Sequence, residues 1–287
     1  MALQANNLCV SRDGKPILRD ITVTLVPGRM IGLLGANGAG KSTLLAALAG
    51  ELTLDAGQVE LNGAPLASLS AKAQARQRAV LPQNPALSFD LCAHEVVSAG
   101  AYPFPELAPA AVEQLVHEAM TLAGVADLYG SPYLSLSAGQ QQRVQFARVL
   151  AQMLVILPDT NTQTDVGRAD GTTDAGAGAG AEAEYPPRYL LLDEPISALD
   201  PRHQIELLRT TSELTDQRHI GALISLHDIN LAAHWCDELI LLGGGTIIAY
   251  GTPAQVLTPA NLRSIYDIDA DVLRHPTQPG RLLVLPR

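Results

Sequence analysis

Residues 30–43 read Met-Ile-Gly-Leu-Leu-Gly-Ala-Asn-Gly-Ala-Gly-Lys-Ser-Thr, and this stretch decides the fold. Its first part, Met30 to Leu34, is an apolar run typical of a buried strand, and a helical run follows from Leu44 to Ala49. The residues between them match G-x-x-x-x-G-K-S, which indicates a phosphate-binding loop when a strand precedes it and a helix follows it. The stretch therefore predicts an α/β fold and a nucleoside triphosphate as the ligand.

The residue types in this loop suit a phosphate group. Glycines at 35, 38 and 40 permit positive φ, so that successive backbone N–H groups can point into one concavity. The helix that begins near Lys41 adds its positive end. We expect Lys41 to bind the β- and γ-phosphates, Ser42 to ligate Mg²⁺ and Thr43 to lie beside the α-phosphate. The predicted nucleotide-binding residues are Gly35, Ala36, Asn37, Gly38, Ala39, Gly40, Lys41, Ser42 and Thr43.

This loop alone does not distinguish a kinase, a GTPase and a transport ATPase, but four later stretches do. The first reads Leu136-Ser-Ala-Gly-Gln-Gln-Gln-Arg143 and places Ser137 as the N-cap of a helix. A serine in this position is often only a cap. A Ser-x-Gly turn at a helix start is also an anion site, and the phosphate loop upstream favours that interpretation.

The other three stretches carry acids or a histidine near strand ends. In Tyr189-Leu-Leu-Leu-Asp-Glu-Pro195 an unbroken apolar run predicts a buried parallel strand that ends in two acids. Acids in that place lie in the ligand crevice of an α/β sheet, where Asp193 suits Mg²⁺ and Glu194 suits a general base. Ser197-Ala-Leu-Asp200 follows directly. Leu223-Ile-Ser-Leu-His-Asp228 predicts another strand, whose His227 is either structural or a γ-phosphate contact, and its order in the chain favours the contact.

In these residues and in their order the sequence resembles the nucleotide-binding subunits of ATP-binding cassette transporters. The resemblance covers most of residues 1–260 and assigns the phosphate loop as Walker A and the strand to Glu194 as Walker B. It implies a signature formed by Ser137, Ala138, Gly139 and Gln140, a D-loop that ends at Asp200, a switch histidine at His227, and Gln83 as the Q-loop glutamine near Mg²⁺.

The resemblance implies a P-loop NTPase fold over residues 1–260, with a mainly parallel RecA-like sheet. An antiparallel β-subdomain comes from residues 1–30 and 57–62, where Asn62-Gly63 is a turn signal, and an inserted helical subdomain spans about 84–150. The apolar residues Leu87, Phe89, Leu91, Tyr102 and Phe104 form the core of that subdomain, and some of them can also line a groove for a short helix of the membrane partner. Residues 261–287 form a C-terminal extension in which we expect a small hairpin with a structural role.

The same resemblance implies that each copy supplies half of each hydrolytic site. Two copies would hold two ATP molecules head to tail, with the signature of one copy against the γ-phosphate bound to Lys41 of the other. Glu194 would orient the attacking water, His227 would stabilise the transferring phosphoryl group, and Asp193 with Gln83 would complete the Mg²⁺ shell. Gln83 would also link the core to the helical subdomain.

The resemblance is strongest to the ATPases of iron-chelate and vitamin B12 importers, and among these to those of haem import. It rests on stretches such as Arg78-Ala-Val-Leu-Pro-Gln83 and His227-Asp-Ile-Asn-Leu-Ala-Ala233. It implies two transmembrane permease subunits, a periplasmic haem-binding protein and a peripheral place at the cytoplasmic face of the bacterial inner membrane. The same role for an iron-siderophore or vitamin B12 is the alternative. A non-transport cassette ATPase that acts on ribosomes or DNA is the alternative of a different class.

Composition agrees with a globular ATPase subunit. The chain has 287 residues, 47% of them hydrophobic, and a formal net charge of −10, which disfavours a nucleic-acid partner. Its start has no basic region of a signal peptide, and no apolar run reaches the ~20 residues that span a bilayer, so we expect the pore on another chain. The cysteines Cys9, Cys92 and Cys236 lie in no metal-binding spacing, and we expect reduced thiols.

Three features depart from the family pattern. Residues 158–187 are rich in Gly, Ala and Thr and carry a net charge of −5 up to residue 184, which predicts a disordered surface insertion. Ala138 stands where the signature usually has glycine, and we expect a weakened but functional turn. Arg12 stands where the family has an aromatic residue against adenine, and its guanidinium either stacks on that ring or is a solvated charge.

Overall fold

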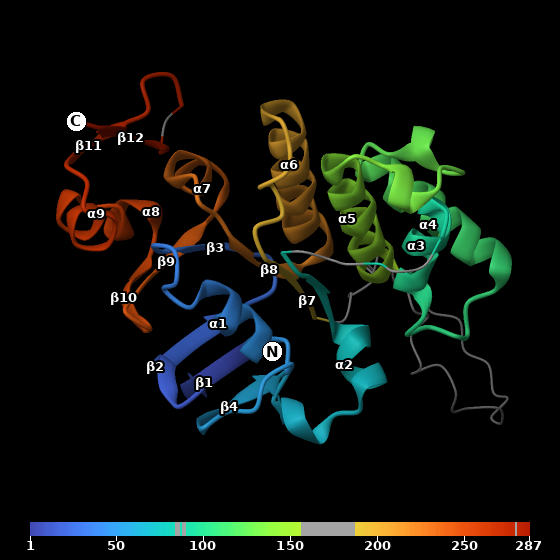
Figure 1. The fold of residues 1–287 in the computed structure, drawn as a ribbon, viewed down its shortest axis with the longest axis horizontal. Helices are drawn as coiled ribbons and strands as arrows, with labels where there is room; N and C mark the ends of the chain where they lie inside the picture. The colour runs from blue at the N-terminus through green and yellow to red at the C-terminus, as the bar shows by residue number, and fades with distance from the viewer. Residues whose placement is uncertain (84–86, 88–89, 156–186, 279) are drawn as a thin grey trace, which may run out of the picture.

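The computed structural model describes residues 1–83, 87, 90–155, 187–278 and 280–287, whose elements are drawn in Figure 1. The strands are β1 (Leu3–Arg12), β2 (Lys15–Leu25), β3 (Met30–Leu34), β4 (Ala56–Leu61), β5 (Ala64–Pro65), β6 (Arg78–Leu81), β7 (Arg188–Leu192), β8 (Ile220–Ser225), β9 (Glu238–Gly243), β10 (Thr246–Gly251), β11 (Ala270–Arg274) and β12 (Leu282–Pro286). The α-helices are α1 (Lys41–Leu48), α2 (Ala71–Gln77), α3 (Ala93–Ser98), α4 (Pro109–Leu122), α5 (Ala138–Leu154), α6 (Pro201–Arg218), α7 (Ile229–Trp235), α8 (Pro253–Val256) and α9 (Pro259–Tyr266).

The central sheet has the strand order β10-β9-β3-β8-β7-β6. Strand β3 pairs in parallel with β8 and β9, and β7 pairs in parallel with β6 and β8, while β10 is an antiparallel edge strand. All five residues of β3 and the residues Tyr189 to Leu192 of β7 are buried, as their apolar runs predicted, and Arg188 at the start of β7 is buried as well. The mainly parallel α/β sheet expected from the sequence is confirmed.

Alternate residues of these strands enter two separate cores, because successive side chains of a strand point to opposite faces. Leu190 and Leu192 pack in one core with α3 to α7 and α9, whereas Tyr189 and Leu191 pack in the other with α1 and the strands β1, β2 and β4. Figure 1 shows the same division, with α5, α6 and α7 on one side of the sheet and α1 on the other. The helix that follows the signature therefore packs on the face opposite α1.

A second, antiparallel sheet has the order β2-β1-β4-β5 and covers α1. The turn between β4 and β5 is Asn62-Gly63, where both residues have positive φ, of 53° and 86°. This conformation is that of a two-residue hairpin turn, which the Asn-Gly pair favours. The predicted turn is confirmed.

The helical region after β6 consists of α3, α4 and α5 with short 3-10 turns between them. Pro109 is the first residue of α4, where its missing N–H costs no hydrogen bond. Phe104 is 1% exposed and belongs to the core, whereas Tyr102 is 88% exposed. Of the aromatic residues predicted here, Phe89 lies outside the described residues.

The C-terminal region lies beside α7 in Figure 1 and contains α8, α9 and the antiparallel pair β11–β12. The acidic insertion predicted at 158–187 lies outside the described residues, apart from Pro187. Among the helices of the described ranges, none combines the length and the apolar character needed to cross a bilayer.

Candidate functional site

The phosphate loop joins β3 to α1, and its shape depends on glycine. Gly35, Gly38 and Gly40 have φ values of 153°, 76° and 103°, which other residues rarely adopt. Gly35 also has no space for a side chain, because a Cβ there would lie 2.4 Å from the carbonyl oxygen of Leu242. Gly40 is the N-cap of α1, so the N–H groups of the first helical turn open toward the loop.

Lys41 lies inside this loop and is only 6% exposed. Its Nζ donates to the carbonyl oxygen of Gly35 at 2.9 Å and to that of Ala36 at 3.4 Å. Burial lowers the pKa of Lys41, while the negative charges of Glu194 and Asp193 raise it. A buried ammonium group beside the N–H groups of a helix start is an arrangement that fits a phosphate.

The two acids after β7 are both positioned by Ser225, the last residue of β8. Its Oγ donates to Oδ1 of Asp193 at 2.7 Å and accepts from the N–H of Glu194 at 2.8 Å. Ser225 is fully buried and Asp193 is 8% exposed. The N–H of Asp193 donates to the carbonyl oxygen of Leu81 at 2.9 Å, which holds the acid at the end of β6.

Glu194 lies between two other predicted site residues. Gln83 donates from Nε2 to its Oε2 at 2.6 Å, and Nε2 of His227 lies 2.5 Å from its Oε1. The backbone of Glu194 has a φ of 47°, a left-handed conformation that costs a non-glycine residue about 1–3 kcal/mol and is kept because surrounding contacts offset that cost. A carboxylate held in this way, 12% exposed beside a half-exposed histidine, suits proton transfer to or from a water molecule.

The strand order explains how these residues meet. The phosphate loop follows β3, Gln83 follows β6, Asp193 follows β7 and His227 follows β8. These strands are parallel, so their carboxyl ends lie at one edge of the sheet, where ligands bind in open α/β folds. The structure thus brings the loop, Gln83, the two acids and His227 to one edge.

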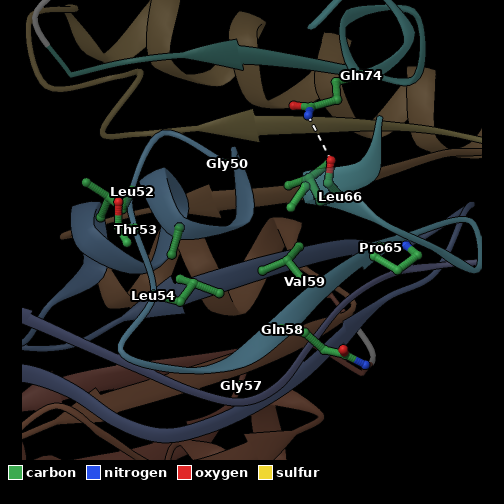
Figure 2. Close-up of a pocket in the computed structure, with 12 residues that line it drawn as sticks. Gly50, Leu52, Thr53, Leu54, Gly57, Gln58, Val59, Pro65, Leu66 and Gln74 are labelled. Carbon is green, nitrogen blue, oxygen red and sulfur yellow. Dashed lines mark hydrogen bonds between the residues drawn. The ribbon is translucent and has the colours of Figure 1, made fainter. Parts of the chain in front are cut away.

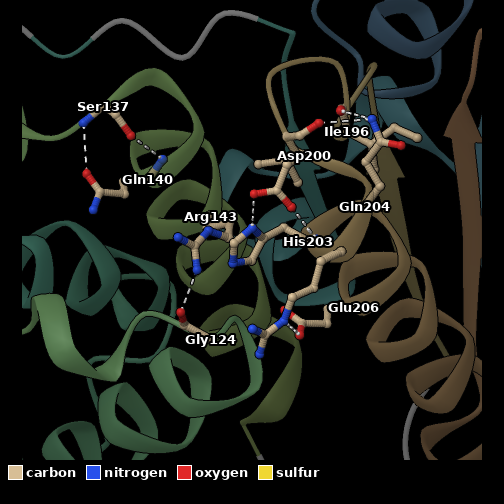
Figure 3. Close-up of polar contacts among 11 residues, drawn as sticks. Gly124, Ser137, Gln140, Arg143, Ile196, Asp200, His203, Gln204 and Glu206 are labelled. Carbon is tan, nitrogen blue, oxygen red and sulfur yellow. Dashed lines mark hydrogen bonds and ion pairs between the residues drawn. The ribbon is translucent and has the colours of Figure 1, made fainter.

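The signature turn at the start of α5 belongs to a different part of the molecule. Ser137 is the N-cap: its Oγ accepts from the N–H of Gln140 at 3.3 Å, and Oε1 of Gln140 accepts from the N–H of Ser137 at 2.9 Å. The predicted N-cap is confirmed, and Figure 3 shows this reciprocal pair. Ala138 is the first residue of the helix and fits there without positive φ. A Cβ on Gly139 would lie 2.9 Å from the carbonyl oxygen of Ala198, so the turn packs closely on the segment before Asp200.

Asp200 caps α6 and is engaged within its own chain. Its carboxylate accepts from the N–H of His203 at 3.1 Å and lies 2.8 Å from Nδ1 of the same residue, as Figure 3 shows. These hydrogen bonds lower the pKa of the Asp200 carboxyl group. The remaining predicted residues are placed as follows: Ser42 is exposed, Thr43 is half-buried, and Arg12 is exposed at the end of β1, opposite Lys15.

Two residues of this site were not predicted from the sequence. Ser225 is the single polar residue in the apolar run from Leu223 to Leu226, and this break in the pattern was a usable signal. Tyr266, at the end of α9, accepts a hydrogen bond from the N–H of Gly35 at 2.9 Å. Nothing in the local pattern around Tyr266 pointed to a residue 231 positions earlier.

A pocket of 340 Å³ lies at the other end of α1 from the phosphate loop. Figure 2 shows its walls, which include Leu52, Leu54, Val59 and Leu66. Helix α1 has eight residues, so the pocket is about 12 Å from the loop. The predicted site residues do not line it.

Comparisons with known proteins point to one family. A family model described as "ABC transporter" matches residues 18–159. The hemin import ATP-binding protein HmuV of Bordetella pertussis is 57% identical over the whole of both chains. That of Pseudomonas fluorescens strain Pf0-1 is 40% identical over 99% of this chain and 100% of its own.

A comparison with solved structures finds a similar fold in an ABC transporter. A solved structure described as an inward-facing conformation of a putative metal-chelate type ABC transporter superposes with a TM-score of 0.73. That match covers 100% of this chain and 97% of the other, at 20% identity. This chain therefore shares the arrangement of its sheets and helices with that solved structure.

Proposed function

This chain belongs to the ABC transporter family as an ATP-binding subunit, and we propose that it hydrolyses ATP to drive the import of haem. The cargo assignment rests on one observation: the chain is 57% identical, over the full length of both proteins, to a protein named for hemin import. An iron-siderophore or vitamin B12 importer would use the same site, so the cargo must be tested by experiment.

The proposed chemistry follows from the edge of the sheet. Lys41 and the loop N–H groups bind the phosphates of ATP, and Glu194 takes the proton of the attacking water. Gln83 and His227, which hold the two carboxylate oxygens of Glu194, keep that base in place. When a nucleotide is bound, His227 can turn to the γ-phosphate and stabilise it by charge and position.

The residues also fit a magnesium ion. Ser42, Asp193 and Gln83 offer a hydroxyl, a carboxylate and an amide oxygen, which are the ligand types that Mg²⁺ prefers. Mg²⁺ is commonly held by one or two carboxylates together with substrate phosphates, so these few protein ligands are sufficient for the proposal. When bound, Mg²⁺ would neutralise charge on the β- and γ-phosphates.

We further propose that the working unit is a pair of copies. The signature helix α5 and the loop helix α1 pack on opposite faces of the sheet, which favours a signature that serves another copy's nucleotide. In the pair, Ser137, Ala138, Gly139, Gln140 and Asp200 would face the ATP that the second copy binds through Lys41. Arg12 would stack on the adenine of its own copy's ATP.

A groove on this chain is the candidate surface for the permease partners. A groove of 790 Å³ lies between α2 and the start of the helical region and is lined by Ala75, Tyr102 and Leu107, among others. Tyr102 is 88% exposed there and adds a large apolar side chain to a wall that already holds Leu107 and Val112. We propose that a short helix of each permease occupies this groove at the cytoplasmic face of the inner membrane, and that a periplasmic haem-binding protein delivers the cargo.

The test is transport by the assembled complex in vesicles. The chain, its permease and a haem-loaded binding protein are combined, and ATP turnover and haem entry are measured. We expect haem-loaded binding protein to raise ATP turnover and a Glu194→Gln variant to abolish haem entry. Stimulation by a siderophore-loaded or cobalamin-loaded binding protein instead would reassign the cargo, and turnover that responds only to ribosomes or DNA would refute a transport role.

A further inference from the structure

The C-terminal clamp, as we call α9 together with β11 and β12, contacts the proposed hydrolysis site of its own copy at two places. One contact reaches the first residue of the phosphate loop, and the other reaches the helix that follows His227. Neither Tyr266 nor Asn230 belongs to a predicted nucleotide-binding motif.

The first contact forms a short chain of hydrogen bonds. The N–H of Gly35 donates to the Tyr266 hydroxyl at 2.9 Å, and the carbonyl oxygen of Gly35 accepts from Nζ of Lys41 at 2.9 Å. Gly35 therefore donates a hydrogen bond to the clamp through its N–H group and accepts one from Lys41 through its carbonyl oxygen. The Tyr266 hydroxyl and the Lys41 ammonium group thus both bond to the backbone of Gly35.

Tyr266 is itself fixed by packing. Leu262 of the same helix is fully buried, and Ile265 lies against Gly243 at the end of β9. A Cβ on Gly243 would approach Cδ1 of Ile265 to 2.4 Å, so the absence of a side chain makes room for this helix. Strand β9 pairs with β3, which leads into the loop, and α9 is thus seated on the strand beside it.

The second contact joins β12 to α7. Asn230 donates from Nδ2 to the carbonyl oxygen of Val284 at 3.1 Å and accepts from the N–H of Val284 at 2.7 Å. Val284 is 2% exposed and Ala270 5% exposed, and both pack in the same core as Ala232 and Ala233 of α7. Asn230 lies in the first turn of α7, three residues after His227.

We propose that the C-terminal clamp positions the phosphate loop and the switch histidine relative to each other, with Tyr266 as a positioning residue for Lys41 and Asn230 as a positioning residue for His227. This proposal rests on the proposed ATPase function and adds to it. The hydroxyl of Tyr266 orders the Gly35 peptide before the nucleotide arrives, so less ordering is required on binding. The two hydrogen bonds between Asn230 and Val284 fix the first turn of α7, and His227 lies just before that helix.

The first arm of the test compares Tyr266→Phe with Tyr250→Phe. Each change removes one partly buried hydroxyl, and that of Tyr250 bonds Glu238 at 2.9 Å, away from the loop. Calorimetry with the full chain measures the Kd of Mg-ATP and Mg-ADP. We expect Tyr266→Phe to raise both Kd values about two- to tenfold, as one lost hydrogen bond allows, and Tyr250→Phe to leave them unchanged. Equal Kd values for the wild type and Tyr266→Phe would overturn the proposal, whereas a wild type that binds no ATP would refute the proposed function instead.

The second arm uses Asn230→Ala in the importer assembled with its permease. We expect the rate at saturating ATP to fall about threefold to tenfold, while the Kd of ATP stays within about twofold of wild type. The two variants then separate binding from turnover, which a merely structural brace does not do. The unfolding midpoint in urea is measured for both variants. If both variants lose ATP binding and hydrolysis rate in proportion to the drop in this midpoint, the clamp only stabilises the fold and the proposal is wrong.

Discussion

Replacement of Ser225 by alanine removes a hydroxyl that bonds to both acids of the site. Its Oγ donates to the Asp193 carboxylate at 2.7 Å and accepts from the Glu194 N–H at 2.8 Å, in a position without solvent exposure. Alanine fits the space, so the change tests the hydroxyl alone.

The expected magnitude follows from these two bonds. A hydrogen bond to a charged group contributes about 1.5–3 kcal/mol, and one between neutral groups about 0.5–1.5 kcal/mol. We therefore expect Ser225→Ala to lower the free energy of unfolding by about 2–4 kcal/mol. The backbone of Glu194, held at a φ of 47°, loses the partner of its N–H. We expect kcat to fall about tenfold or more, because a misplaced Glu194 raises the activation free energy, and each ~1.4 kcal/mol of that increase lowers the rate tenfold.

Thr211→Val is the matched control. Thr211 is also fully buried, and its hydroxyl donates to the carbonyl oxygen of Leu207 within α6, remote from the acids. Urea unfolding and steady-state ATP hydrolysis by the assembled importer are measured for both variants. Thr211→Val should lose stability but keep its kcat. If the two variants lose kcat equally, Ser225 has no particular role toward the acids and the reasoning is wrong.

Three further predictions concern binding, assembly and packing. Glu194→Gln should stop hydrolysis and trap an ATP-bound pair of copies, seen by size-exclusion chromatography with Mg-ATP; a persistent monomer would speak against the sandwich. Arg12→Ala should raise the Kd of ATP and Arg12→Tyr should preserve it, and an unchanged Kd for the alanine variant would retire the stacking hypothesis. Gly100→Ala should lower the free energy of unfolding in urea by about 1–3 kcal/mol, because its Cβ would meet the carbonyl oxygen of Arg148 at 2.2 Å; an unaltered midpoint would contradict that packing.

The strands and turns that are determined by residues close together in the chain could be predicted from the sequence. The apolar run of β3 and the Asn62-Gly63 turn are dictated by residues within a few positions, and both lie where the pattern predicted them. The meeting of Gln83, Glu194 and His227 was also predictable, because parallel strands bring their carboxyl ends to one edge.

Contacts that depend on the final packing were not predictable. The bond from Gly35 to Tyr266 and the pair between Asn230 and Val284 exist only because α9 and β12 settle against the central sheet. The sequence marked the C-terminal region as a small hairpin with a structural role and gave no reason to connect it with the phosphate loop. Side-chain reach across the fold, rather than local pattern, decides such contacts.

The most direct test of the central claim is the rate of ATP hydrolysis per chain as a function of protein concentration, with the molar mass followed by light scattering. If each copy supplies half of every site, the rate per chain must rise with concentration in step with the fraction of paired copies. A full and constant rate in samples that contain only single copies would contradict the account.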